Sequence, residues 1–195
     1  TDESCSIKNY RVGPLFPLEL SPENIDIMNK IGVFILGELL ERDELNDFEE
    51  TLLLSIEWFS RSQTQIEKKN RLLNLITCME TLLNPGGVEP IQKSISQGVA
   101  IILNDDPLRR KKLKDRIIEL YKFRSTVIHG RKNEILNSDI RELTHIVGSL
   151  IMVLIKMKDQ CQFESKNDLA NWIEYRIFGG SPENWMDYRK SLIIT

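Results

Sequence analysis

The chain contains 195 residues, of which 41% are hydrophobic and 28% are charged, a composition typical of one folded domain and not of a disordered chain. Its 26 basic and 29 acidic side chains give a formal net charge of −3, which argues against a protein that coats nucleic acid by bulk positive charge. Any contact with RNA must therefore come from a local basic patch.

Cysteines and histidines are few and scattered. The three cysteines, Cys5, Cys78 and Cys161, form no C-x-x-C pair, which argues against a disulfide scaffold and favours a reducing compartment. With only two histidines and no Cys/His cluster, we expect neither a metal site nor a cofactor. The N-terminal sequence lacks the features of a secretion signal, and the apolar stretch 146–155 is too short to cross a bilayer. We therefore expect a cytoplasmic protein without a membrane partner.

Helix signals dominate the first half of the chain. Residues 1–20 contain glycine and prolines and are expected to be an irregular lead-in. Ser21-Pro22-Glu23-Asn24 has the residues of a helix start, and it predicts one helix whose apolar positions continue to Leu39. A second helix follows a charged break. A third helix is predicted to begin near Gln63 and to include Ile66 among its apolar positions.

The second half repeats the alternation of helices and turns. Asn84-Pro85-Gly86-Gly87 is a strong turn signal. The helices predicted after it start at Pro90, Leu108, Asn137, Ser165 and Ser181, and the second of them runs to Gly130. The segment 146–155 is apolar on nearly all sides, so its helix should be central in the bundle or at a subunit interface.

No segment alternates with a period of two, so we predict an all-α fold, a bundle of about 6–8 helices. Residues 21–160 should form the bundle, and residues 161–195 an aromatic-rich helical extension packed on the same domain. The aromatic residues of this extension are Phe163, Trp172, Tyr175, Phe178, Trp185 and Tyr188. They could pack as a helical cap, form a subunit contact or stack on bases.

Arg124 continues the apolar stripe of the helix 108–130 by its spacing, where a guanidinium needs a carboxylate or another anion. Glu80, a polar residue on another mostly apolar helix, could be that partner. His129 follows five residues after Arg124, about 140° around an ideal helix. A close Arg–His pair therefore needs either a frayed helix end or a second copy of the helix across a two-fold axis. Both residues could instead be structural, as an ion-pair residue and a helix C-terminal residue.

Two stretches resemble the Apea-like branch of the HEPN superfamily: LITCMETLL at 75–83 and IIELYKFRSTVIHG at 117–130. That branch has an E-x-L pattern on one helix and LY-x-x-RS-x-x-x-HG on a later one. The matching elements are Glu80-Thr81-Leu82, Leu120-Tyr121, Arg124-Ser125 and His129-Gly130. The resemblance implies a HEPN-like helical bundle that usually dimerises. Many members are metal-independent ribonucleases of toxin–antitoxin, CRISPR-linked or antiphage systems, and others only bind nucleotides or scaffold a partner.

The resemblance implies catalytic roles for Arg124, His129 and Ser125. An imidazole can act as general acid or base near neutral pH, a guanidinium can stabilise the charge on the phosphorane, and Ser125 would add a hydrogen bond. Glu80 would orient Arg124, or it is a structural acid, and Tyr121 is expected to be a packed aromatic with a polar tip. The expected partners are RNA, a second copy that completes a composite site, and an antitoxin or a sensor domain.

The same helix opens with Arg109, Arg110, Lys111 and Lys112. Basic charge is unfavourable at a helix N-terminus, so these residues form either a solvated helix start or an RNA phosphate contact. Arg131 stands where HEPN toxins neutralised by nucleotidyl transfer commonly carry a tyrosine, so the chain does not resemble that subgroup. Two functions remain open: an endoribonuclease of a toxin or defence system, and a catalytically inactive HEPN module that binds nucleotide or RNA or assembles with a partner protein.

Overall fold

The computed structural model describes residues 21–30, 32–84, 86, 90–128 and 135–193. These residues form nine α-helices and one short 3-10 helix, with no strand among them, so the all-α prediction is confirmed. In chain order the helices are α1 (Pro22–Lys30), α2 (Val33–Leu40), α3 (Asp47–Thr64), α4 (Lys68–Leu83), α5 (Ile91–Leu103), α6 (Pro107–Ile128), α7 (Asn137–Gln160), α8 (Lys166–Ile177), η1 (Pro182–Asn184) and α9 (Trp185–Ile193). The predicted lead-in, 1–20, lies outside the described residues.

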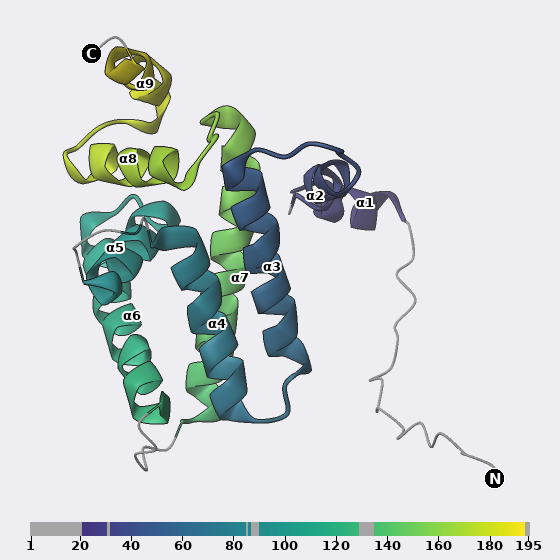
Figure 1. Cartoon of the computed structure of the whole chain (residues 1–195), viewed down its shortest axis with the longest axis vertical. Helices are drawn as coiled ribbons and strands as arrows, with labels where there is room; N and C mark the ends of the chain where they lie inside the picture. Colours follow the sequence, from purple (N-terminus) through teal and green to yellow (C-terminus); the bar gives the residue numbers. More distant parts are fainter. Residues whose placement is uncertain (1–20, 31, 85, 87–89, 129–134, 194–195) are drawn as a thin grey trace.

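The bundle is built from α3, α4, α6 and α7, which run along its length (Figure 1). The most extensive contacts join consecutive helices, α3 with α4 and α5 with α6, as short connections require. The helices α8 and α9 lie across one end of the bundle, whereas α1 and α2 lie at its side (Figure 1). In the described part of the chain, no helix has the length and apolar character needed to cross a membrane.

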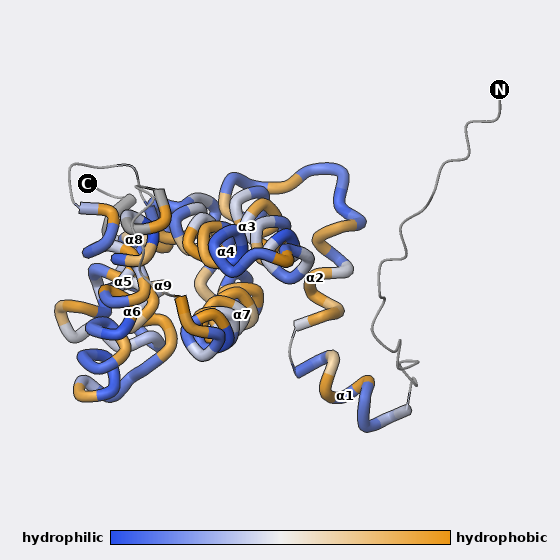
Figure 2. The backbone as a smooth tube through the Cα atoms, turned by 90° about the horizontal axis from the view of Figure 1, so that it is seen from below, coloured by the Kyte–Doolittle hydropathy of each residue, from blue (hydrophilic) through white to orange (hydrophobic). Residues whose placement is uncertain are grey.

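The helix α7 occupies the centre, as its apolar sequence predicts. It contacts α2, α3, α4 and α5, and Val147, Leu150 and Leu154 are fully buried. Figure 2 shows α7 with α5 and α6 on one side and α1 and α2 on the other. The side of the bundle that carries α2 is therefore remote from the side that carries α6.

Two of the predicted helix boundaries are wrong. The single helix expected from Ser21 to Leu39 is two helices, because Gly32 adopts a left-handed conformation with φ of 85° and ends the first of them. Ile66 lies between α3 and α4 and is 96% exposed, because α3 continues to Thr64 and α4 begins only at Lys68. Apolar spacing alone does not separate an apolar residue in a connection from one in a helix.

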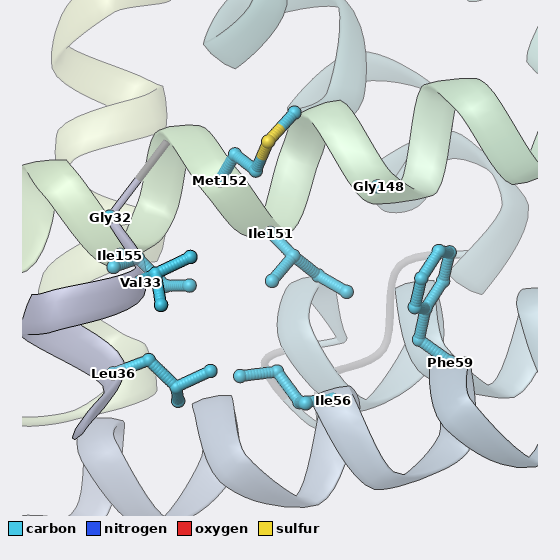
Figure 3. A pocket seen from close by; sticks show the side chains of 9 residues that line it. All are labelled: Gly32, Val33, Leu36, Ile56, Phe59, Gly148, Ile151, Met152 and Ile155. Carbon is cyan, nitrogen blue, oxygen red and sulfur yellow. The ribbon is translucent and has the colours of Figure 1, made fainter. Parts of the chain in front are cut away.

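One face of α7 borders an open cavity of about 330 Å³ beneath α2 (Figure 3). Its lining is apolar throughout and consists of Gly32, Val33, Leu36, Ile56, Phe59, Gly148, Ile151, Met152 and Ile155. Two glycines contribute to this space. A Cβ at Gly148 would lie 3.5 Å from the Phe59 ring, an ordinary contact, whereas a Cβ at Gly32 would lie 2.8 Å from the Ile155 side chain.

We expect opposite effects of alanine at these two glycines. Gly148→Ala should raise the free energy of unfolding by about 1 kcal/mol, because Gly148 lies inside α7 and the new methyl group contacts Phe59 without overlap. Gly32→Ala should lower it by at least about 1 kcal/mol, because its positive φ and the Ile155 contact disfavour a side chain. Urea unfolding of both variants measures this. If Gly148→Ala is destabilised instead, the space beside the Phe59 ring does not accept a methyl group.

The C-terminal extension is held by its aromatic residues. Phe163 contacts Phe48 of α3 at 5.1 Å between ring centroids, which joins the extension to the bundle. The ring contacts then continue through Trp172, Trp185, Tyr175 and Tyr188. Packing is therefore the role of five of the six aromatic residues. The sixth, Phe178, is 82% exposed.

Candidate functional site

Three polar side chains of α4 and α6 form a connected group, which we call the Glu80 cluster: Glu80, Tyr121 and Arg124. The Tyr121 hydroxyl donates a hydrogen bond to Glu80 Oε1 at 2.5 Å, and Arg124 Nε lies 3.0 Å from the same oxygen. Arg124 Nη2 donates to Glu80 Oε2 at 3.4 Å. The guanidinium therefore faces both oxygens of the carboxylate through one of its edges.

Helix periodicity brings Tyr121 and Arg124 to one face of α6. They are three residues apart, and the Arg124 guanidinium lies 5.9 Å from the centre of the Tyr121 ring. Ile117 and Leu120 are fully buried and fix this part of α6 against the bundle. The Arg124 side chain is 39% exposed and that of Glu80 is 17% exposed. Arg124 therefore lies at the edge of the core and not inside it, which corrects the inward position expected from its spacing.

Hydrogen bonding fixes the Glu80 carboxylate. Burial, together with the hydrogen bond to Glu80 and its negative charge, raises the pKa of Tyr121 to about 12. Tyr121 is therefore a neutral hydrogen-bond donor at cellular pH. Among the residues that the structure describes, no hydrogen bond engages Arg124 Nη1, a nitrogen that can donate to an anion.

The structure joins three of the five predicted site residues. Ser125 follows Arg124 on α6 and is exposed, and its hydroxyl makes no hydrogen bond with a described residue. His129 follows α6 and lies outside the described residues, so its distance from Arg124 is not part of this geometry. Glu80 is the carboxylate partner that the sequence suggested for Arg124, and this contact fits both an orienting role and a structural role.

The four predicted RNA contacts at the start of α6 divide into two kinds. Arg109, Lys111 and Lys112 are exposed. Arg110 is half-buried, donates from Nε to the Asn104 carbonyl at 2.6 Å and has Nη2 3.7 Å from Asp105. Arg110 therefore stabilises the turn between α5 and α6, and three residues remain as candidates for RNA contact.

Arg116 of α6 has a structural role that the sequence analysis did not identify. Arg116 Nη2 lies 2.7 Å from Asp139 and 2.7 Å from Glu142, and Nη1 lies 3.1 Å from Glu119. These contacts attach the start of α7 to α6. No local sequence pattern predicts the contacts with α7, because the acids of α7 are more than twenty residues away from Arg116 in the sequence.

The described His, Cys, Asp and Glu side chains do not form a metal-binding cluster. Within the described ranges, no three His, Cys, Asp or Glu side chains are placed to coordinate one ion. Cys78 and Cys161 are buried and unpaired, and burial raises the pKa of their thiols to about 12 and about 11. These thiols are therefore protonated at neutral pH and are poor nucleophiles or ligands.

No protein-family model, curated protein or solved structure matches this chain. The chemistry available at the Glu80 cluster thus follows from its own geometry: an oriented, partly exposed guanidinium on a helix that also carries three exposed basic side chains at its start.

Proposed function

We propose that this protein is a metal-independent endoribonuclease of the HEPN type that acts as a toxin or an antiphage defence effector. Arg124 stabilises the negative charge that develops on the phosphorane when the RNA 2′-hydroxyl attacks. His129 serves as general acid or base, and Ser125 adds a hydrogen bond in the cleft. The observation that carries the proposal is the position of Arg124, whose one edge is held by Glu80 while its side chain stays 39% exposed.

In the proposed enzyme two copies form the active site. A two-fold axis beside α6 would place two Arg124–His129 sets around one cleft. The Arg124 of one copy could then lie close to the His129 of the other, although the two residues point about 140° apart on one ideal helix. The exposed bases Arg109, Lys111 and Lys112 lie on the same helix and would hold the RNA backbone. An antitoxin or a sensor domain is the partner expected to control such an activity.

A second candidate function is a catalytically inactive HEPN module that binds nucleotide or RNA or assembles with a partner protein. The observation that favours it is the charge of Glu80, which neutralises Arg124 at 3.0 Å and lowers its attraction for phosphate. Both candidates keep the same side chains, so only an assay of RNA cleavage separates them.

Purified protein incubated with single-stranded RNA in EDTA tests the proposal. We expect fragments with a 2′,3′-cyclic phosphate and a 5′-hydroxyl, which His129→Ala abolishes. His145→Ala is the matched control, because His145 is the only other histidine and is exposed on α7. Intact RNA, or equal cleavage by the wild type and His129→Ala, would reject the proposed ribonuclease activity.

The exposed bases at the start of α6 are tested by RNA binding. Neutralising Arg109, Lys111 and Lys112 should flatten the salt dependence of RNA binding, and an unchanged slope would show that they do not contact RNA.

A further inference from the structure

A second cavity, of about 410 Å³, lies between the end of α4, one face of α5 and α8. Leu83, Ala170, Ile173 and Ile177 give it an apolar wall. Hydrogen-bonding side chains, among them Gln97, also line it. A cavity of this size with an apolar wall and a few polar groups has the features of a site for a small ligand. We call it the α5/α8 cleft.

The polar groups of the cleft include several that the fold does not use. The side chains of Ser94 and Gln97 on α5 and of Glu174 on α8 make no hydrogen bond or ion pair with any described residue. Ser94 and Gln97 are half-buried, and their side-chain polar atoms are not among the buried unpartnered ones, so they stay open to hydrogen bonds from water or a ligand. Glu174 brings a negative charge to the lining, which disfavours an anionic ligand.

The Gln97 amide determines the edge that such a ligand must present. A side-chain amide carries one acceptor and two donors side by side, so its complement is an adjacent N–H and C=O, as in a lactam or a carboxamide. Two parallel hydrogen bonds then form between the two amide edges. An apolar surface beside them, here Ile173 and Leu83, suits the flat face of a ring.

Phe178 completes the recognition of a flat ring. It is the one aromatic residue of the extension that takes no part in the described ring contacts, and it is 82% exposed where it borders the cleft. An aromatic side chain held at the mouth of a cleft offers a face for stacking, and its exposure would be reduced by a bound ring.

We infer that the α5/α8 cleft binds a planar, uncharged heteroaromatic ring whose edge carries an adjacent N–H and C=O. The Gln97 amide pairs with that edge, Phe178 stacks on the ring, and Ile173 packs against it. The ligand is either a free small molecule or an unpaired base of an RNA strand, since both present the same edge. This inference is independent of RNA cleavage at Arg124, so either can fail without the other.

The test is titration of the methyl-labelled protein, with the Leu83 and Ile173 methyl resonances as reporters. The probes are uridine, nicotinamide, oligouridylate RNA and 3-methyluridine, which lacks the N–H of the lactam edge. We expect uridine and nicotinamide to shift the reporters in a saturable manner and 3-methyluridine to bind at least about ten-fold more weakly. Saturable shifts with oligouridylate identify an RNA base as the source, and shifts with the free probes alone identify a small molecule.

Two variants with one control complete the test. Phe178→Ala should weaken uridine binding about ten-fold, and Gln97→Met should reduce the affinity for uridine to that for 3-methyluridine. Phe34→Ala, which removes a partly exposed aromatic of α2 outside the cleft, should bind uridine as the wild type does. Absence of saturable shifts with every probe, or equal affinity of the wild type for uridine and 3-methyluridine, would overturn the inference.

Discussion

Arg124→Ala is expected to lower the rate of RNA cleavage by about 10²–10³-fold, because it removes the guanidinium proposed to stabilise the charged transition state. The fold should survive. The Arg124 side chain is 39% exposed, and an ion pair this open to solvent contributes only about 0–1 kcal/mol to stability. Cleavage kinetics and urea unfolding of the same preparation therefore separate a catalytic role from a structural one.

Three further variants test how Arg124 is held. Arg124→Lys keeps the charge but loses the two-point contact with Glu80, so an intermediate rate is expected. Tyr121→Phe removes the hydroxyl that donates to Glu80, which should lower kcat by about ten-fold with little change in KM. Glu80→Gln keeps the shape of the side chain but frees the charge of Arg124, which should tighten RNA binding while kcat falls.

The opposite pattern supports the inactive module. If the wild type does not cleave RNA, while Arg124→Ala weakens RNA binding and Glu80→Gln strengthens it, the Glu80 cluster is a binding site without catalytic activity. A loss of cleavage in proportion to a loss of folded protein would remove the catalytic role of Arg124.

Most of the fold could be predicted from the sequence because helix signals are local. Ser165 was expected to start a helix, and its side chain does accept a hydrogen bond from the Asp168 backbone at the start of α8. Gly32 was missed because glycine within a helical pattern is often tolerated, and only the backbone angle shows that it ends α1. Ile66 was missed because apolar spacing does not report exposure.

The candidate site could be predicted only in part. Arg124 and Glu80 were recognisable because each places a charge on an otherwise apolar stripe, and two such residues often meet. The engagement of Arg110 with the Asn104 carbonyl and the α5/α8 cleft around Gln97 depend on tertiary packing. Periodicity along one helix carries no signal for contacts of that kind.

A buried ion network that the sequence analysis did not identify should produce the largest stability effect. Lys158 near the end of α7 has a side chain only 2% exposed, and its Nζ lies 3.2 Å from Glu49 Oε1 and 2.6 Å from Asp159. Glu49, itself 6% exposed, also accepts from Arg42 at 2.8 Å and from the Asn46 backbone at 3.2 Å. The network ties the start of α3 to the end of α7. The Asn46-x-x-Glu49 spacing of a capping box was its one visible sign.

Lys158→Met is expected to lower the free energy of unfolding by about 3 kcal/mol, because the Glu49 carboxylate stays buried with less positive charge beside it. Lys156→Met is the matched control. Lys156 is an exposed lysine of the same helix, and its replacement should cost no more than about 0.5 kcal/mol. Urea unfolding of both variants gives the comparison.

The double variant Glu49→Leu/Lys158→Met distinguishes a lost charge partner from lost packing. Replacing both buried charges by apolar side chains is often close to neutral, so the double variant should recover part of the stability that Lys158→Met loses. The Asn46 backbone N–H loses its acceptor in this variant, which keeps the recovery incomplete. If the double variant is less stable than Lys158→Met by the full cost of Glu49→Leu, the two side chains do not interact and α7 is held to α3 by apolar contacts alone.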